Sequence, residues 1–178
     1  MKHSKQMLTA LMDASSAIIL YKAGLHRFVC EVYNVIMPIS VYREIAGNFH
    51  PGSDIYRQLH TDKKITIQAL DPVIDGQPAT PGLSDLDRGE RDVVYLYFAG
   101  NCDFIITDDG GAAQYCQREK IPFINALLIP LVLKYAMNQT DFHSQEAFEK
   151  VRKHGRYSQW VIDFAQRCER KHLSFFLP

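Results

Sequence analysis

The sequence has few cysteines, no net charge and no long apolar run, and each absence excludes a class of protein. Its four cysteines form no C-x-x-C pair, so we expect reduced thiols in a cytoplasmic protein and no zinc knuckle or redox pair. Lys+Arg and Asp+Glu both number 20, so no whole-molecule field draws the protein to nucleic acid or to an anionic membrane. No segment reaches the length of a membrane span. We therefore expect a soluble cytoplasmic protein without a membrane partner, whose contacts with nucleic acid depend on a local patch.

Glycine-rich phosphate loops are also missing. The chain has no G-x-G-x-x-G and no Walker motif, which argues against a nucleotide-binding enzyme. A receiver or haloacid-dehalogenase type of phosphoryl transfer is disfavoured as well. Asp13-Ala14-Ser15 lacks the second acid of a D-x-D loop, and no lysine lies near a late strand in a position to clamp a phosphoryl oxygen.

The remaining composition is that of an ordinary globular domain. With 178 residues, of which 47% are apolar and 22% charged, the chain can bury a sizeable core in one domain. Short apolar strands alternate with segments of helical spacing, which favours a parallel sheet. The expected strands are residues 9–12, 35–38, 65–70, 103–107 and 121–124, and the expected helices are 15–24, 25–33, 40–45 with Ser40 as N-cap, 84–100, 110–119, 125–137, 141–154 and 157–171. Residues 48–62 are expected to be irregular or weakly helical, and residues 71–83 to form a loop.

Acidic residues directly follow two of the expected strands. Asp13 comes after residues 9–12, and Asp108 and Asp109 come after residues 104–107. Ligands of an open α/β sheet bind at the carboxyl ends of its strands. Because adjacent residues of an extended chain point opposite ways, one of the paired aspartates is expected to face the site, Asp108 first and Asp109 as the alternative. Capping of the next helix is the competing explanation for these acids.

Further acids occur at expected helix starts. Glu90 has apolar residues at i+3, i+4 and i+7, so we expect it on the inward face of a buried helix. Glu44 shares a helix face with Val41. A capping box with Asp87 is the alternative for Glu90, and a surface ion pair is the alternative for Glu44. Oxygen ligands without histidine or cysteine select Mg²⁺ or Mn²⁺ over zinc.

Four short motifs follow one another along the chain. They are MDAS at 12–15, PISVYREI at 38–45, LDRGE at 86–90 and IITDD at 105–109. In order and spacing they resemble the PIN-domain nucleases, which include the VapC-type ribonuclease toxins of toxin–antitoxin pairs. The resemblance covers about residues 8–125, and GRYS at 155–158 resembles the C-terminal extension of a PIN subgroup.

The resemblance implies a fold and a reaction. The fold would be a three-layer α/β/α sandwich around a mainly parallel sheet. One domain, residues 1–178, would have its core at about 8–125 and a helical extension at about 126–178. The reaction would be hydrolysis of RNA by a Mg²⁺- or Mn²⁺-dependent endoribonuclease, in which carboxylates hold one or two ions that activate water. The products would carry a 5′-phosphate and a 3′-hydroxyl.

The resemblance also implies roles for individual residues. The catalytic and metal-binding set would be Asp13, Glu44, Glu90 and Asp108. Ser15 would support Asp13, and Asp92 and Asp109 are secondary candidates. The chain departs from related sequences in one respect, because no basic residue follows the last acid before Arg118.

Partners and a competing function stay open at this point. Arg152, Lys153 and Arg156 form a basic cluster that contacts RNA or is simply a solvated face. The apolar residues 125–137 are either core or a surface for an antitoxin or a second copy. Residues 157–171 carry Trp160, Val161, Phe164 and Cys168 on one stripe. The competing function is a catalytically weak or inactive PIN-fold module that acts by binding nucleic acid or protein.

Overall fold

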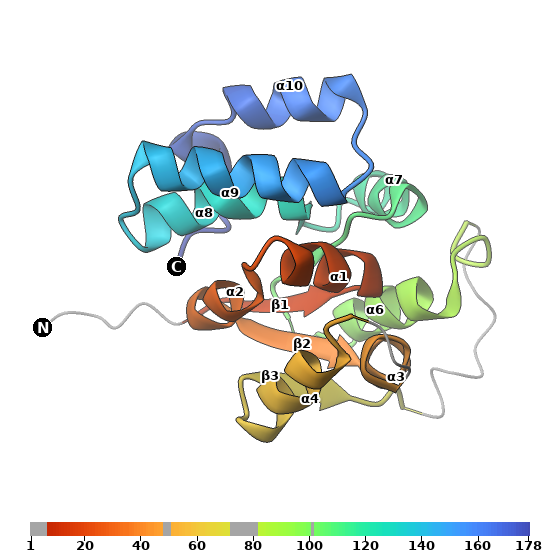
Figure 1. Cartoon of the computed structure of the whole chain (residues 1–178). Coiled ribbons are helices and arrows are strands. Elements are labelled where there is room, and N and C mark those ends of the chain that lie inside the picture. The colour runs from red at the N-terminus through yellow and green to blue at the C-terminus, as the bar shows by residue number, and fades with distance from the viewer. Residues whose placement is uncertain (1–6, 48–50, 72–81, 101) are drawn as a thin grey trace, which may run out of the picture.

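Five parallel strands form the centre of the molecule. The computed structural model describes residues 7–47, 51–71, 82–100 and 102–178. The strands lie side by side in the order β3-β2-β1-β4-β5, and helices flank the sheet (Figure 1). They are β1 (Thr9–Met12), β2 (Asn34–Pro38), β3 (Ile65–Gln68), β4 (Phe104–Ile106) and β5 (Phe123–Ile124). The expected α/β class with a mainly parallel sheet and a helical C-terminal extension is confirmed.

Six helices of the described residues connect these strands. They are α1 (Ala14–Lys22), α2 (His26–Val32), α3 (Ile39–Gly47), α4 (Ser53–Thr61), α6 (Arg88–Phe98) and α7 (Gly110–Arg118). Two of them begin at aspartates that follow strands, because Asp13 caps α1 and Asp109 caps α7. Each carboxylate accepts a backbone N–H of the first turn, which an uncapped helix leaves without a partner.

The sequence-based boundaries were wrong at several helices, including the helix expected at 157–171, which spans only Gln159–Arg167. Helix α3 begins at Ile39, so Ser40 lies in its first turn instead of capping it. Residues 53–61, expected to be irregular or weakly helical, form the regular helix α4. Helix α6 begins only at Arg88, because Asp87 has an extended backbone and serves as N-cap. Of the expected loop 71–83, residues 72–81 lie outside the described residues.

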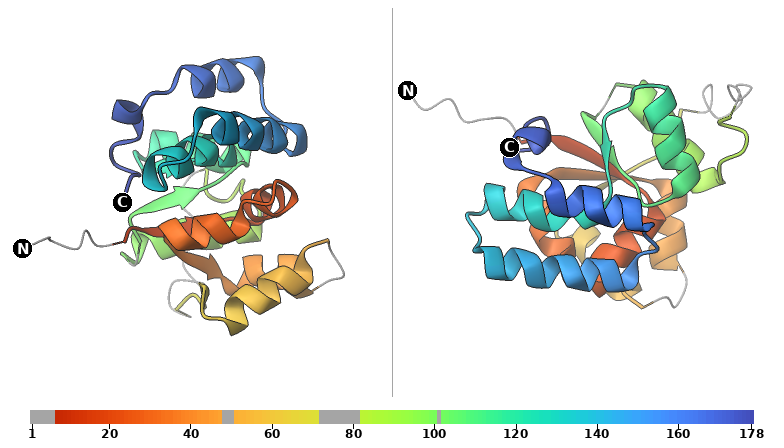
Figure 2. Two further views of the ribbon diagram at one scale, coloured as in Figure 1. Left: turned by 60° about the vertical axis from the view of Figure 1, so that its left-hand side comes forward. Right: turned by 90° about the horizontal axis from the view of Figure 1, so that it is seen from above.

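The C-terminal third is helical. It consists of a 3₁₀ turn η1 (Ala126–Leu128), α8 (Ile129–Ala136), α9 (Asp141–His154), α10 (Gln159–Arg167) and a 3₁₀ turn η2 (Arg170–Leu173). Helix α9 packs against α8 and against α1, and all three C-terminal helices lie together on one side of the molecule (Figure 2). The chain end is tied back to the core, since the Tyr33 hydroxyl donates to the carbonyl of Phe176 at 2.6 Å.

The apolar residues 125–137 belong to the core. Leu127, Ile129 and Val132 are all 0% exposed, so the hypothesis that this segment is a docking surface for a partner was wrong. The four cysteines are free thiols, as expected, and are buried or half-buried. None of the helices in the described ranges is long and apolar enough to cross a membrane.

Candidate active site

The candidate site lies where the order of strands reverses. From β1 the chain proceeds to β2 and β3 on one side, and β4 and β5 then add on the other side of β1. In open parallel sheets the crevice at such a switch point, at the carboxyl ends of the strands, is where ligands bind. Met12 and Ile106, the last residues of β1 and β4, are paired in register. The residues that follow them, Asp13 and Thr107-Asp108, therefore lie next to one another.

Asp13 is a buried carboxylate with three hydrogen-bond donors. Its Oδ1 accepts the backbone N–H of Ser16 at 2.7 Å, and its Oδ2 accepts the hydroxyls of Ser15 at 3.0 Å and Thr107 at 2.6 Å. Asp13 is only 2% exposed. Burial raises the pKa of Asp13, and the hydrogen bond from Thr107 opposes that effect. Capping of α1 and membership in an acidic site are thus combined in one residue.

Asp108 is held in a similar way. Its Oδ2 accepts the hydroxyl of Ser16 at 2.7 Å and the backbone N–H of Ala126 at 2.9 Å. Its Oδ1 accepts the phenol of Tyr157 at 2.5 Å. Burial raises the pKa of Asp108 to about 6, and the Tyr157 hydrogen bond acts against that rise. Ser16 bridges the two carboxylates, because its N–H binds Asp13 and its hydroxyl binds Asp108. We refer to Asp13 and Asp108 as the acid pair.

Tyr157 reaches Asp108 because a glycine makes room for its ring. A Cβ built on Gly155 would lie 2.2 Å from Cε2 and 2.6 Å from the hydroxyl of Tyr157. Real Cβ atoms do not approach so closely, so any larger residue at 155 has to displace the ring. The segment between α9 and α10 is therefore shaped to bring a phenol from the C-terminal extension onto the acid pair.

Glu90 and Asp109 form a second group of acids. Glu90 is half-buried at the start of α6, and its carboxylate accepts the backbone N–H of Asp87 at 3.1 Å, as the capping-box alternative predicts. Burial, followed by the negative charge of Asp109, raises the pKa of Glu90 to about 7, and Asp13 adds to the effect. Asp109 caps α7 through Ala112 N–H at 2.9 Å. Adjacent aspartates thus have different partners: Asp108 binds Ser16, Ala126 and Tyr157, and Asp109 binds the first turn of α7.

Two other predicted site residues lie apart from the acid pair. Asp92, only 5% exposed, accepts a short hydrogen bond from Ser40. Glu44 is exposed, contrary to the expectation that apolar neighbours would shield it. Its Oε2 lies 3.7 Å from where a Cβ on Gly89 would be, so it stands beside the start of α6. Among the described residues, neither Glu44 nor Asp92 is hydrogen-bonded to the acid pair.

Comparison with known families assigns the chain as a whole. The sequence profile of a family described as "DUF3368: PIN domain" matches residues 9–162. The chain belongs to the PIN-domain family. The match runs past residue 125, where the motif resemblance ended, and includes the first four residues of α10.

Other comparisons of this PIN domain give less. A solved structure that resembles it is a PilT N-terminus domain protein from the hyperthermophilic archaeon Sulfolobus solfataricus P2. The two are 12% identical with a TM-score of 0.44, over 85% of this chain and 100% of the other. None of the curated proteins matches the chain.

The carboxylate oxygens of this PIN domain supply part of what a hard divalent cation needs. An ionised carboxylate has about four lone-pair sites, and each member of the acid pair uses three of them, which leaves one on Oδ1. Mg²⁺ is commonly bound by one or two carboxylates and completes its shell with water and substrate phosphates. Within the described ranges, no three Asp, Glu, His or Cys side chains come together as a preformed metal site. The acid pair therefore fits one such ion only if water or substrate supplies the other ligands.

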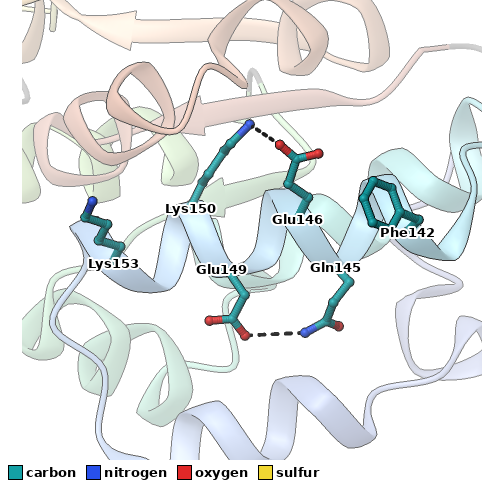
Figure 3. Close-up of a pocket in the computed structure, with 6 residues that line it drawn as sticks. All are labelled: Phe142, Gln145, Glu146, Glu149, Lys150 and Lys153. Carbon is teal, nitrogen blue, oxygen red and sulfur yellow. Dashed lines mark hydrogen bonds and ion pairs between the residues drawn. The ribbon is translucent and has the colours of Figure 1, made fainter.

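The basic residues of the PIN domain's extension are exposed. Arg152 pairs with Glu149 at 3.4 Å, while Lys153 and Arg156 have no ion pair in the part of the chain that the structure describes. A groove on α9 is separate from the acid pair: it is lined by Phe142, Gln145, Glu146, Glu149, Lys150 and Lys153 (Figure 3). Its carboxylate at 146 is neutralised by Lys150 at 2.8 Å.

Three residues of the site in this PIN domain were missed by reasoning from the sequence. Ser16, Thr107 and Tyr157 all donate hydrogen bonds to the acid pair. Ser16 and Thr107 adjoin motifs that were recognised, so a search for hydroxyls around each aspartate would have found them. Tyr157 lies 49 residues from Asp108, and only its place in the GRYS motif hinted at a role.

Proposed function

We propose that this PIN domain is a Mg²⁺- or Mn²⁺-dependent endoribonuclease whose catalytic centre is built on Asp13, Asp108 and Glu90. One observation carries the proposal: Ser16 bridges a buried and a half-buried carboxylate, Asp13 and Asp108, at the ends of adjacent parallel strands. Burial of an ionised carboxylate costs free energy unless it is compensated. The pKa values of Asp13 and Asp108 are raised despite their hydrogen bonds, which shows that these bonds compensate only part of the cost. A bound cation removes the remaining cost.

The three acids have different tasks in this proposal. Asp13 and Asp108 each offer one oxygen, Oδ1, while their hydrogen bonds fix the carboxylates in place. These two oxygens would hold a divalent ion, which would supply an activated water molecule and offset the charge that develops on the phosphodiester. Glu90, whose pKa is raised to about 7, is half-protonated near neutral pH and is suited to accept a proton from the attacking water or to return one. Ser15 and Thr107 position Asp13, and Asp109 holds the charge that tunes Glu90.

In this proposal Glu44 and Asp92 support the catalytic centre from neighbouring positions. The carboxylate of Glu44 lies beside Gly89 at the start of α6, where a substrate or hydrated ion entering next to Glu90 would meet it. Asp92 joins α6 to α3 through Ser40, so we propose that it orients the turn that carries Glu90. We also propose that the core, about residues 8–125, and the extension, about 126–178, form one domain, because Tyr157 completes the setting of Asp108.

The test compares cleavage of end-labelled RNA by matched variants. Asp13→Asn removes one charge from the acid pair and Glu90→Gln removes the proton acceptor, while Asp62→Asn changes an exposed acid at the end of α4. We expect the first two to lose on the order of 100-fold in rate and the third to stay unchanged, with products that carry 5′-phosphates. Circular dichroism checks folding. Metal-dependent cleavage by the double variant Asp13→Asn/Glu90→Gln would show that the assignment is wrong.

A second function competes with this one. Three acids do not converge within the described residues, and this observation favours a PIN-fold module that binds RNA without cleaving it. In that case Mn²⁺ and RNA bind, yet panels of RNA and single-stranded DNA stay intact. An action as the toxin of a toxin–antitoxin pair requires an inhibitory partner, so we propose it only as the biological setting of the nuclease, to be tested by whether expression arrests growth and destroys RNA.

A further inference from the structure

Helix α10 carries two aromatic side chains that its packing does not use. Its inward side is formed by Ala165, 6% exposed, with Cys168 just beyond the helix, 8% exposed. Trp160 and Phe164, which the sequence placed on one stripe with Cys168, instead face outward and are 71% and 48% exposed. Their rings stack on each other, with centroids 5.9 Å apart and planes 17° apart. We refer to these two residues as the stacked aromatic pair.

The chain around the stacked aromatic pair is locally basic. Residues 152–167 contain four Lys or Arg and one Asp, in a protein whose overall formal charge is zero. The acid, Asp163, accepts a hydrogen bond from Gln159 at 2.7 Å. Arg156 precedes α10 and Arg167 ends it, and both are exposed. Exposed aromatic rings among cations are the features with which proteins hold single-stranded nucleic acid, whose bases stack on the rings while the phosphates meet the cations.

The stacked aromatic pair is also close to the acid pair. Tyr157 touches Asp108 and Trp160 comes three residues later, so their Cα atoms are at most about 11 Å apart. The hydrogen bond of Tyr157 fixes the start of this segment against the candidate active site. The N-terminal end of α10 therefore lies close to the acid pair.

We propose that the stacked aromatic pair, with Arg156 and Arg167, is a binding surface for single-stranded RNA that guides the substrate into the acid pair. This proposal rests on the proposed nuclease function for its purpose, but binding is measurable without cleavage. A second copy of the chain or a protein partner is the competing occupant. The basic residues on either side and the link to Asp108 favour RNA. A stacked pair that served only a protein contact, or only the stability of α10, would need neither of these features.

The experiment uses Trp160 as its own reporter, because it is the single tryptophan of the sequence. The full chain is titrated in EDTA, where metal-dependent cleavage is blocked, with a mixed-sequence single-stranded RNA of about 12 nucleotides. We expect saturable quenching of the tryptophan fluorescence. Phe164→Leu should weaken RNA binding roughly 5- to 150-fold, the range that corresponds to loss of one base stack, and Trp160→Leu should do the same when a labelled RNA is followed by anisotropy.

Matched controls separate the outcomes. Phe142→Leu changes an aromatic residue on α9 that is more exposed than Phe164, 73% against 48%, and should leave the affinity unchanged. Arg156→Ser should lower the slope of log affinity against log salt by about 0.7. Absence of quenching, or equal losses in Phe142→Leu and Phe164→Leu, overturns the proposal. So does a monomer–dimer change in Trp160→Leu without a change in RNA affinity, which assigns the surface to a second copy. Quenching that persists in a protein unable to cleave RNA with Mg²⁺ supports the surface and refutes the nuclease assignment.

Discussion

Replacing Tyr157 by phenylalanine removes one hydrogen bond from Asp108 and nothing else. The phenol donates to Oδ1 of that carboxylate at 2.5 Å, and the ring that remains still fills the space beside Gly155. The loss therefore isolates the value of one donor to a buried acid. It also tests whether the C-terminal extension is coupled to the acid pair.

The expected cost depends on pH because the acceptor titrates. The pKa of Asp108 is about 6, raised mainly by burial, so the carboxylate is ionised at pH 8 and protonated at pH 4.5. A hydrogen bond to a charged group contributes about 1.5–3 kcal/mol and one to a neutral group about 0.5–1.5 kcal/mol. Tyr157→Phe should therefore lower the free energy of unfolding by ~1 kcal/mol more at pH 8 than at pH 4.5.

The measurement is urea unfolding in EDTA at both pH values, followed by circular dichroism. Tyr56→Phe is the matched control, since its hydroxyl donates to the carbonyl of Ala17 at 2.6 Å, a buried acceptor that does not titrate. We expect the control to lose about 0.5–1.5 kcal/mol equally at both pH values. If Tyr157→Phe shows the same pH-independent loss as Tyr56→Phe, the phenol is not bound to a charged acid and the reasoning fails.

The remaining predictions concern the same site and the thiols. Gly155→Ala forces the Tyr157 ring aside, so it should cost at least as much as Tyr157→Phe plus about 1–3 kcal/mol of overpacking, measured in the same unfolding assay; a neutral effect would contradict the close approach. The pKa values of Asp108 and Glu90 are raised to about 6 and about 7, so their protonated forms favour the folded state. Their contribution is full below pH 4 and is lost as the pH rises through 6 to 7. In EDTA the melting temperature should accordingly fall between pH 5 and pH 8, and Mg²⁺ should restore it mainly at the higher pH; no restoration at any concentration would refute metal binding. Burial raises the pKa of three thiols to about 12, those of Cys30, Cys102 and Cys116. Iodoacetamide at pH 8 should therefore not modify them in the folded protein. Rapid labelling detected by mass spectrometry would contradict this.

The acid pair could be predicted because it depends on short-range rules. Asp13 and Asp108 each follow an apolar strand, and parallel strands bring their carboxyl ends to one edge. Helical spacing predicted Glu90 on the inward face of α6, and the structure has it half-buried in the alternative role of a capping-box residue. Asp92 was underestimated, because its burial depends on Ser40 of α3, and spacing along α6 says nothing of which helix packs against it.

Long-range contacts, and the choice of which helix face is exposed, could not be predicted from the sequence. Helix α4 was missed because its apolar residues are few, although Tyr56 and Leu59 are 3% and 5% exposed. On α10, helical periodicity identified a stripe but could not tell which side of it meets the core. Trp160 and Phe164 face outward, and that choice is made by the packing of the whole extension.

The hydrogen bonds of Asp108 determine when the site can form during synthesis of the chain. Its donors come from residues 16, 126 and 157, so its setting is incomplete until the last of them has been synthesised. Ribosomes add about 5–20 residues per second, and the 49 residues between Asp108 and Tyr157 therefore delay it by about 2–10 s. A nascent chain that already has its whole sheet still lacks the finished acid pair, so a nuclease of this design would become active only after the segment that carries Tyr157 has been translated.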